Sequence, residues 1–426
     1  MQFRTLRKGS RDVQTELLQL ALTRAGYKIA VDGIFGSKTR EAVLNFQWKN
    51  GLAADGIVGE KTWGELYPYL VGYAEHTIVK GDTIYKLAAK YGTVTDAIFT
   101  ANHDIVPENL QIGQKIIIPL AFPVVPENVK FTSVVTELCI DGILKRYPFV
   151  KTETIGESVL GKRLTCLKLG DGKAKMFINA SHHANEWLTT PLVLLFAENY
   201  AKAIADGTLI DGENAQKLAE SVSLYLVPLV NPDGVDLVTG EISDKNAARI
   251  AADFPKIPYP NGWKANIAGT DLNLQYPAGW EEARKIKFAQ GYTKPAPRDY
   301  VGSAPLTAPE SRAVYDFAMK QKFDLTISYH TQGRVIYWQY LDFASREAFE
   351  IGKKLAAASG YELAYTPYES SFAGFKDWYI EKFRKPGYTV EIGMGTPPLP
   401  VSDLRTVYRD NLGLIVTALA ECKRMG

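Results

Sequence analysis

The sequence predicts an α/β protein whose largest part is a sheet flanked by helices, preceded by two small modules. From about residue 129 to residue 426, short apolar segments with strand character alternate with longer helical segments. Residues 1–70 contain an internal repeat, and residues 75–120 follow the order strand, helix, helix, strand. The predicted parts are therefore 1–72, 74–120 and 129–426, with a stiff, proline-containing linker at 121–128.

The composition excludes several classes of protein. A chain of 426 residues with 46% hydrophobic and 23% charged residues is typical of a globular protein of two or three domains. The net charge of +2 gives no strong attraction to nucleic acid, and no apolar run of about 18 residues predicts a membrane span. Three scattered cysteines argue against a disulfide framework or a cysteine metal site. No signal peptide is visible, so we expect synthesis in the cytoplasm, with export by another route left open.

The repeat in the first 70 residues predicts a compact three-helix module. Val31–Thr39 (VDGIFGSKT) recurs as Ala54–Thr62 (ADGIVGEKT), and each Asp-Gly pair favours a tight turn followed by a helix start. Helical patterns cover Val13–Ala25 and Glu41–Trp48. The simplest alternative is a packing domain with no ligand of its own.

The second module is expected to begin and end with a strand. The predicted strands are His76–Val79 and Lys115–Ile118, and the helices between them are Ile84–Tyr91 and a segment around Val94–Asn102. Thr83 or its neighbour Asp82 can cap the first helix.

The large domain should carry its functional side chains at strand ends, because sites in such sheets gather at the carboxyl ends of strands. The predicted strands are Leu164–Leu169, Lys175–Ala180, Val222–Val230, Asp324–Ser328 and Gly387–Ile392. The predicted helices are Thr132–Tyr147, Leu188–Gly207, Ala308–Lys320, Arg346–Ser359 and Leu404–Lys423.

A histidine and a glutamate follow the apolar strand that ends at Ala180. His183 and Glu186 are three residues apart on a turn entering a helix, so both side chains should lie on one side. Such a pair can supply two corners of a zinc site. An H-x-x-E pair also arises often by chance, and the alternative is two polar loop residues that cap a helix.

The histidine count narrows the choice of a third ligand. Of five histidines, His76 and His103 lie in the small modules, and His330 follows a predicted strand. His182 competes with His183, but neighbours in an extended segment face opposite ways, and only His183 keeps the spacing to the glutamate. His330 is therefore the best third ligand.

Glu391 lies within the apolar strand segment Tyr388–Gly393. Burying a carboxylate is costly unless the group is paired or functional. Glu391 is therefore either paired with a Lys or Arg or serves as a general base beside a zinc-activated water. Two histidines and one glutamate would leave the fourth zinc position open for that water.

The two small modules resemble known wall-binding families. The first segment resembles the peptidoglycan-binding domain family along nearly all of its length, through the motifs D-G-I-F-G, T-R-E-A-V-L-N-F-Q and D-G-I-V-G. The second segment resembles the LysM family through the motifs V-K-G-D-T-I-Y-K-L-A and L-Q-I-G-Q-K-I-I-I-P. This family binds polymers that contain N-acetylglucosamine. These resemblances imply peptidoglycan as the partner.

The large domain resembles the zinc carboxypeptidase family over about residues 129–426. The resemblance rests on G-E-S-V-L-G-K-R-L, H-A-N-E-W, N-P-D-G, D-L-N and T-V-E-I-G in this order. It implies a carboxypeptidase-like mixed sheet, one zinc ion per chain, and a turn at Asn231–Gly234 after a core strand. Carried onto this sequence, it also implies the ligands His183, Glu186 and His330, the general base Glu391 and the substrate contact Asn273.

This chain departs from the family at two arginine positions. The family's carboxypeptidases have Arg after the Asn that corresponds to Asn273, where it grips the terminal carboxylate, but this chain has Leu274. A second Arg usually follows the Trp that corresponds to Trp263, but here the residue is Lys264, which supplies charge without a bidentate fork. These two departures argue against a simple exopeptidase that clamps a free C-terminus.

Three further residues are candidates for substrate binding. Lys376 precedes Asp377 at a position that lines the family's specificity pocket, so it is expected either to meet an acidic group or to be solvated and unrelated. Arg334 is a candidate for a carboxylate contact. Tyr368 is a candidate for the family's mobile tyrosine.

The combination of parts resembles the bacterial γ-D-glutamyl-L-diamino-acid endopeptidases that carry such modules. It implies hydrolysis of the γ-D-glutamyl-diaminopimelate bond in peptidoglycan stem peptides, in the cell wall or the spore cortex. One alternative is a metallocarboxypeptidase that removes C-terminal residues from peptides. The other is a non-catalytic wall-binding protein.

Overall fold

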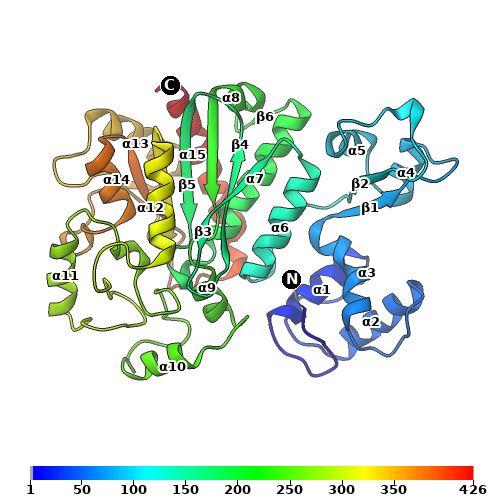
Figure 1. The fold of residues 1–426 in the computed structure, drawn as a ribbon, viewed down its shortest axis with the longest axis horizontal. Coiled ribbons are helices and arrows are strands. Elements are labelled where there is room, and N and C mark those ends of the chain that lie inside the picture. Colours follow the sequence, from blue (N-terminus) through cyan, green and yellow to red (C-terminus); the bar gives the residue numbers. More distant parts are fainter. Residues whose placement is uncertain (1–2, 426) are drawn as a thin grey trace. The chain divides into compact units, whose positions relative to one another are not determined.

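The structure is a computed structural model that describes residues 3–425 (Figure 1). The chain forms two compact units. The first comprises the residues up to Lys130 together with Glu137–Val150, and the second comprises Phe131–Thr136 and the chain from Lys151 onward.

The first 72 residues form the expected three-helix module. Its helices are α1 (Val13–Arg24), α2 (Ser37–Lys49) and α3 (Glu60–Val71). The sequence repeat has a structural counterpart, because Gln19 Nε2 donates to Asp32 Oδ1 at 2.8 Å and Gln47 Nε2 donates to Asp55 Oδ1 at 3.1 Å. In each copy, a glutamine on one helix therefore holds the Asp-Gly turn that precedes the next helix.

The second module has the predicted order of strand, two helices and strand. Strand β1 (Tyr73–Thr77) pairs antiparallel with β2 (Lys115–Pro119), and α4 (Ile84–Tyr91) and α5 (Thr95–Ala101) lie between them in sequence. Thr83 Oγ1 accepts a hydrogen bond from Lys86 N, which confirms the expected helix cap. A short 3₁₀ turn, η1, covers Pro107–Asn109.

An eight-stranded mixed sheet forms the centre of the second unit, with strand order β11-β10-β12-β9-β5-β8-β4-β3. The four central strands β12, β9, β5 and β8 run parallel, whereas β8–β4, β4–β3 and β12–β10 are antiparallel pairs. The strands are β3 (Lys151–Glu157), β4 (Arg163–Leu169), β5 (Ala174–Ala180), β8 (Val222–Val227), β9 (Leu325–Thr331), β10 (Val335–Tyr337), β11 (Glu362–Ala364) and β12 (Gly387–Ile392). A separate small hairpin joins β6 (Leu209–Ile210) and β7 (Glu213–Asn214). The α/β class and the mixed sheet are confirmed.

Helices cover both faces of this sheet (Figure 1). On one face, α7 (Thr189–Asp206) and α15 (Leu404–Lys423) pack against β5 and against each other. On the other face, Phe177 of β5 lies in a core cluster with Phe317 of α12 (Pro309–Gln321) and Phe375 of α14 (Phe375–Phe383). The remaining helices are α6 (Ser133–Arg146), α8 (Ala215–Ser221), α9 (Pro232–Thr239), α10 (Lys245–Ala252), α11 (Trp280–Ala289) and α13 (Arg346–Ser359).

The turn expected at Asn231–Gly234 is the first turn of α9, because Asn231 is a good N-cap and Pro232 fits the first helical position. The Asn231 Oδ1 atom accepts a hydrogen bond from Gly234 N at 3.0 Å. The strand predicted to end at Ser328 continues to Thr331, so His330 lies inside β9.

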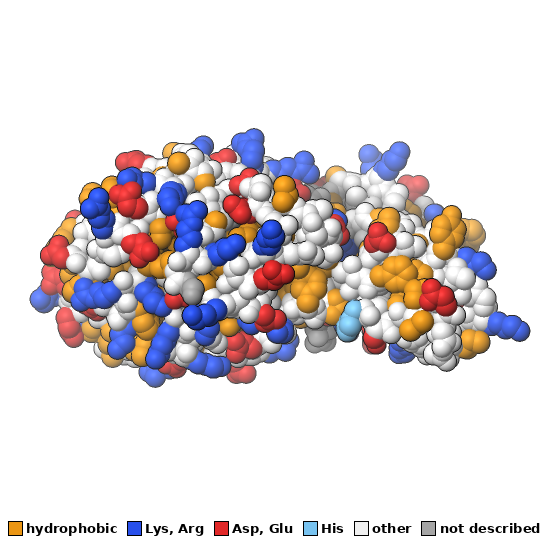
Figure 2. All heavy atoms as spheres, turned by 90° about the horizontal axis from the view of Figure 1, so that it is seen from above, with side chains coloured by type: hydrophobic (Ala, Val, Ile, Leu, Met, Phe, Trp, Pro, Cys, Tyr) orange, Lys and Arg blue, Asp and Glu red, His pale blue; other side chains and the backbone are white. Residues whose placement is uncertain are grey.

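Within residues 3–425, no helix combines the length and the hydrophobicity needed to cross a lipid bilayer. Figure 2 shows acidic and basic side chains interspersed over one face of the molecule. This distribution agrees with the small net charge of +2.

Candidate functional site

The candidate site lies at the carboxyl ends of the three adjacent strands β5, β9 and β12. After β5, Ser181 adopts a left-handed backbone conformation (φ 54°), and the chain turns into η2 (Ala184–Glu186), which carries Glu186. His330 lies near the end of β9, directly opposite Glu391 of β12 in the parallel register. Adjacent strands therefore bring together side chains that are far apart in sequence.

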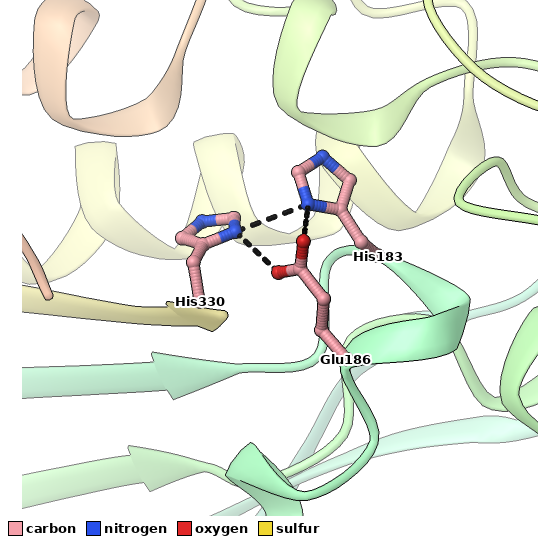
Figure 3. A group of neighbouring side chains, drawn as sticks. All are labelled: His183, Glu186 and His330. Carbon is pink, nitrogen blue, oxygen red and sulfur yellow. Dashed lines mark hydrogen bonds and ion pairs between the residues drawn. The ribbon is translucent and has the colours of Figure 1, made fainter. Parts of the chain in front are cut away.

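Three buried side chains converge in this site, as Figure 3 shows. His183 Nδ1 lies 2.9 Å from Glu186 Oε1, and His330 Nδ1 lies 2.9 Å from Glu186 Oε2. The two Nδ1 atoms are 3.1 Å apart. The sequence predicted this group of three, and the structure brings all of its members together.

The group suits a divalent cation. Two imidazole nitrogens and a carboxylate oxygen are the donor set of many catalytic zinc sites, and they leave one position open. Burial lowers the pKa of His183, but Glu186 and Asp271 outweigh this effect and raise it to about 9. The surroundings therefore stabilise positive charge here, and His183, Glu186 and His330 can hold one zinc ion.

Asp271 orients His183 from the side away from the other two ligands. Its Oδ1 atom lies 3.1 Å from His183 Nε2, which leaves Nδ1 directed at Glu186 and His330. Burial raises the pKa of Asp271, but His183 and Lys264 reverse the effect and hold it well below its usual range. An ionised carboxylate on the outer nitrogen fixes the tautomer and the ring orientation of a histidine ligand. The D-L-N motif predicted Asn273 but not this role of Asp271.

His182 is not part of the group. Its Nε2 atom is hydrogen-bonded to Tyr276 Oη at 2.9 Å, and the side chain is fully buried. Burial, followed by the charges of His330 and His183, lowers its pKa well below the usual value. His182 and His183 therefore face opposite ways, as expected, and only His183 points into the site.

Glu391 and Lys264 face the same group. Burial, followed by repulsion from Glu186, raises the pKa of Glu391 to about 8. Lys264 Nζ lies 3.1 Å from Glu186 Oε1, and attraction to Glu186 and Asp271 outweighs the effect of its burial, so its pKa is raised. Both side chains line the cavities at the site, so a carboxyl group with a raised pKa and a cation adjoin the three candidate ligands.

Two cavities, of about 250 Å³ and about 760 Å³, meet at this point. They share Lys264, Arg298, Tyr337 and Glu391. His183 and His330 line the smaller cavity, while the larger extends past Asn185 and residues 256–262. A bound chain therefore has space on both sides of Glu391.

Besides Lys264, two more of the predicted substrate-binding residues line the smaller cavity. Asn273 does so while its Oδ1 atom accepts a hydrogen bond from Phe375 N at 3.1 Å. Lys376 is buried, and its Nζ atom lies 2.6 Å from Asp377 Oδ1 and 2.5 Å from the Gln339 carbonyl oxygen. The alternative that Lys376 is solvated is therefore wrong.

The other two predicted substrate-binding residues lie elsewhere. Arg334 pairs with Asp410 at 3.5 Å and lies over the Tyr361 ring, and it is absent from the lining of both cavities. Tyr368 is 64% exposed, and its hydroxyl donates to Glu282 Oε1. Its neighbours Thr366, Pro367 and Ser370 line the smaller cavity, but Tyr368 itself does not.

Arg298, Lys287 and Asp299 also line the smaller cavity, and none of them was predicted. Lys287 Nζ lies 2.8 Å from Asp299 Oδ1, and Arg298 Nε lies 2.6 Å from Asp299 Oδ2. They belong to a loop and a helix without a recognisable motif, so spacing alone gave no signal.

Comparison with known proteins identifies the family. The zinc carboxypeptidase profile matches residues 137–413, which is more than half of the chain. The chain belongs to the zinc carboxypeptidase family. It therefore carries a zinc metallopeptidase domain, and the three candidate ligands lie within the matched range.

Two relatives are identical to this chain at about two fifths of the aligned residues. Gamma-D-glutamyl-L-diamino acid endopeptidase 1 of Lysinibacillus sphaericus is 41% identical over 278 residues, which cover 64% of this chain and 68% of the relative. The uncharacterized protein YqgT of Bacillus subtilis (strain 168) is 40% identical over 284 residues, covering 66% and 74%.

A solved structure shares the fold, and two further profiles match the small modules. Bovine thrombin-activatable fibrinolysis inhibitor, in complex with tick carboxypeptidase inhibitor, aligns with a TM-score of 0.54 at 19% identity, covering 70% of this chain and 99% of that one. The peptidoglycan-binding domain profile matches residues 11–66, and the LysM profile matches residues 76–119. Both modules of this chain are thus of the predicted types.

Proposed function

We propose that this protein is a zinc-dependent peptidoglycan hydrolase that cleaves the γ-D-glutamyl-diaminopimelate bond of stem peptides. The observation that carries the proposal is the 41% identity to a γ-D-glutamyl-L-diamino acid endopeptidase in a chain that keeps a buried group of two histidines and a glutamate. Leu274 supports it, because this apolar residue occupies the position where the family's carboxypeptidases grip a free C-terminus.

The proposed chemistry divides the work among the residues of the site. His183, Glu186 and His330 hold the zinc ion, which when bound lowers the pKa of water and polarises the scissile carbonyl. Glu391 accepts a proton as the water oxygen bonds to the carbonyl carbon. It then delivers a proton to the leaving amine as the C–N bond breaks. Lys264 supplies positive charge beside the developing oxyanion.

The shape of the cleft suits an endopeptidase. The two cavities share Glu391 and Lys264, so substrate has room on the acyl side and on the amine side of the bond. Asn273 and Lys376 are the proposed contacts on the side of the smaller cavity.

The N-terminal modules give the proposed enzyme its place of action. We propose functional boundaries at 1–72, 74–120 and 129–426, which agree with family matches at 11–66, 76–119 and 137–413. Modules that hold glycan strands raise the local concentration of stem peptides without new contacts in the active site. The proposed site of action is the cell wall or spore cortex peptidoglycan.

Digestion of purified muropeptides tests the proposal. The zinc-loaded protein should release fragments whose masses correspond to cleavage between the γ-D-glutamyl residue and diaminopimelate. Stepwise loss of C-terminal residues would instead indicate a carboxypeptidase, and intact muropeptides would indicate a binding protein. The Glu391→Gln variant is the matched control, because the carboxylate is replaced by an amide of similar shape.

A further inference from the structure

Four basic side chains line the smaller cavity, and each of them has a close carboxylate partner. Lys264 lies 3.1 Å from Glu186, Lys376 lies 2.6 Å from Asp377, and Lys287 lies 2.8 Å from Asp299. The fourth is Arg298, whose ion-pair partner is the same Asp299, at 2.6 Å from Nε. One carboxylate, that of Asp299, thus pairs with two cations on this side of the cavity.

Arg298 is the accessible member of this pair. Its side chain is 43% exposed and lines both cavities, whereas the Lys287 side chain is 11% exposed. The contact with Asp299 uses Nε, so the two terminal amino groups of the guanidinium remain available as a planar pair of donors. Such a fork matches a carboxylate and binds it with two parallel hydrogen bonds.

The backbone holds this pair in a fixed relation to the candidate metal ligands. Asp299 has φ 64°, an uncommon conformation for a residue other than glycine. In this conformation its N–H donates to Asp271 Oδ2 at 3.1 Å, while Asp271 Oδ1 lies 3.1 Å from His183 Nε2. Asp299, which pairs with Arg298, is therefore linked to the candidate zinc ligand His183 by two hydrogen bonds through the Asp271 carboxylate. Strained backbone conformations are frequent at binding sites, where surrounding contacts enforce them.

We propose that Arg298, positioned by Asp299, binds a substrate carboxylate adjacent to the scissile bond and so determines specificity. This proposal rests on the proposed function. In a stem peptide that ends at the diamino acid, two such groups flank the bond: the α-carboxylate of the γ-linked glutamate, and the carboxylate on the diamino-acid carbon that bears the scissile nitrogen. With Leu274 where the family's carboxypeptidases have Arg, Arg298 supplies the guanidinium for this cavity from a different part of the chain.

Four synthetic peptides distinguish the two carboxylates. In the first both are free, in the second the glutamate α-carboxylate is an amide, in the third the diamino-acid carboxylate is an amide, and in the fourth both are amides. The kcat/KM of each is measured for the zinc-loaded full chain and for Arg298→Gln, Arg298→Lys and Arg284→Gln. Arg284 is a matched control, since it is 47% exposed and pairs with Glu281 on the helix surface.

Arg298→Gln should lower kcat/KM about 10- to 100-fold on the first peptide, which is the range for a charged hydrogen-bond pair. In either the second or the third peptide, the carboxylate that Arg298 binds is replaced by an amide. On that peptide Arg298→Gln should change kcat/KM by less than about twofold, and this result identifies which carboxylate Arg298 binds. Arg298→Lys should fall between wild type and Arg298→Gln, and Arg284→Gln should behave as wild type. An equal loss on all four peptides, or no loss on any, overturns the proposal.

Binding provides a second readout that does not require turnover. Calorimetry with the zinc-loaded Glu391→Gln protein measures the affinity for the same four peptides, with and without Arg298→Gln. The proposal predicts weaker binding only of peptides that retain the recognised carboxylate, and equal affinities contradict it. If wild type binds the first peptide through Arg298 but cleaves none of the four, the proposed function fails while the carboxylate site stands.

Discussion

Replacing Asp271 with asparagine should weaken zinc binding although Asp271 does not touch the metal position. Asp271 accepts hydrogen bonds from His183 Nε2 and Asn273 N through Oδ1, and from Asp299 N through Oδ2. In Asp271→Asn one of these oxygens becomes an NH₂ group. The less costly orientation keeps the oxygen toward His183, because the opposite orientation would place NH₂ against two donors.

In that orientation His183 exchanges a charged acceptor for a neutral one. A hydrogen bond to a charged group contributes about 1.5–3 kcal/mol and a neutral one about 0.5–1.5 kcal/mol, so the loss is about 1–1.5 kcal/mol. Since about 1.4 kcal/mol corresponds to a factor of ten, we expect zinc affinity to fall about tenfold. The opposite amide orientation would give a fall of about 100-fold, the upper end for such outer-sphere partners.

The assay is competition for zinc between the apoprotein and a chromogenic chelator at neutral pH. Asp236→Asn is the matched control, because Asp236 is similarly buried and accepts hydrogen bonds from Ser133 N and Lys162 but contacts no candidate ligand. Affinity within twofold of wild type for Asp271→Asn would refute the proposed orientation of His183. An equal loss in Asp236→Asn would assign the effect to general destabilisation.

Three further outcomes follow from the site and its surroundings. Glu391→Gln should retain stoichiometric zinc by metal analysis while kcat falls about 10²- to 10⁴-fold, and loss of zinc in this variant would contradict its role as a base alone. Removal of zinc by a chelator should abolish muropeptide cleavage, and adding zinc back should restore it. Cleavage by the metal-free protein would contradict this prediction. Glu310 is buried, which raises the pKa of this carboxyl from 4.5 to about 7, so its contribution to stability is present below pH 4.5 and is lost as pH rises toward 7. The stability of wild type relative to Glu310→Gln should therefore decrease by about 3 kcal/mol over this interval in thermal unfolding, and a difference that does not change with pH would contradict this prediction.

The candidate ligands were predictable because each depends on local sequence and on a general rule for sheets. The three-residue spacing of His183 and Glu186 is a local feature of the sequence. The tight turn after β5 brings the two side chains together. His330 and Glu391 were found by searching strand ends, and they lie opposite each other because β9 and β12 are parallel neighbours. The strand and helix patterns were likewise local, so α13 and α15 have the predicted bounds.

The substrate-binding residues were harder to predict because loops carry them. Distance along the chain from a ligand is a poor guide, as Arg334 shows. It follows His330 by four residues, yet a left-handed backbone conformation (φ 55°) accompanies its pairing with Asp410, away from both cavities. Lys376 was placed correctly by its motif, but its burial against Asp377 could not be read from the sequence.

The loop that carries Arg298 illustrates what determines such positions. Lys264 N and Ala265 N both donate to the Pro297 carbonyl oxygen, at 2.8 and 2.9 Å, and Asp299 N donates to Asp271. All three donors are backbone N–H groups, which every residue except proline carries, and the contacts join segments more than 25 residues apart. Sequence pattern therefore carries little information about this loop. The same contacts place Arg298 beside Lys264 in the cleft, so a residue proposed to determine specificity lies on a loop without a motif, whereas the candidate metal ligands lie in or directly after the strands β5 and β9.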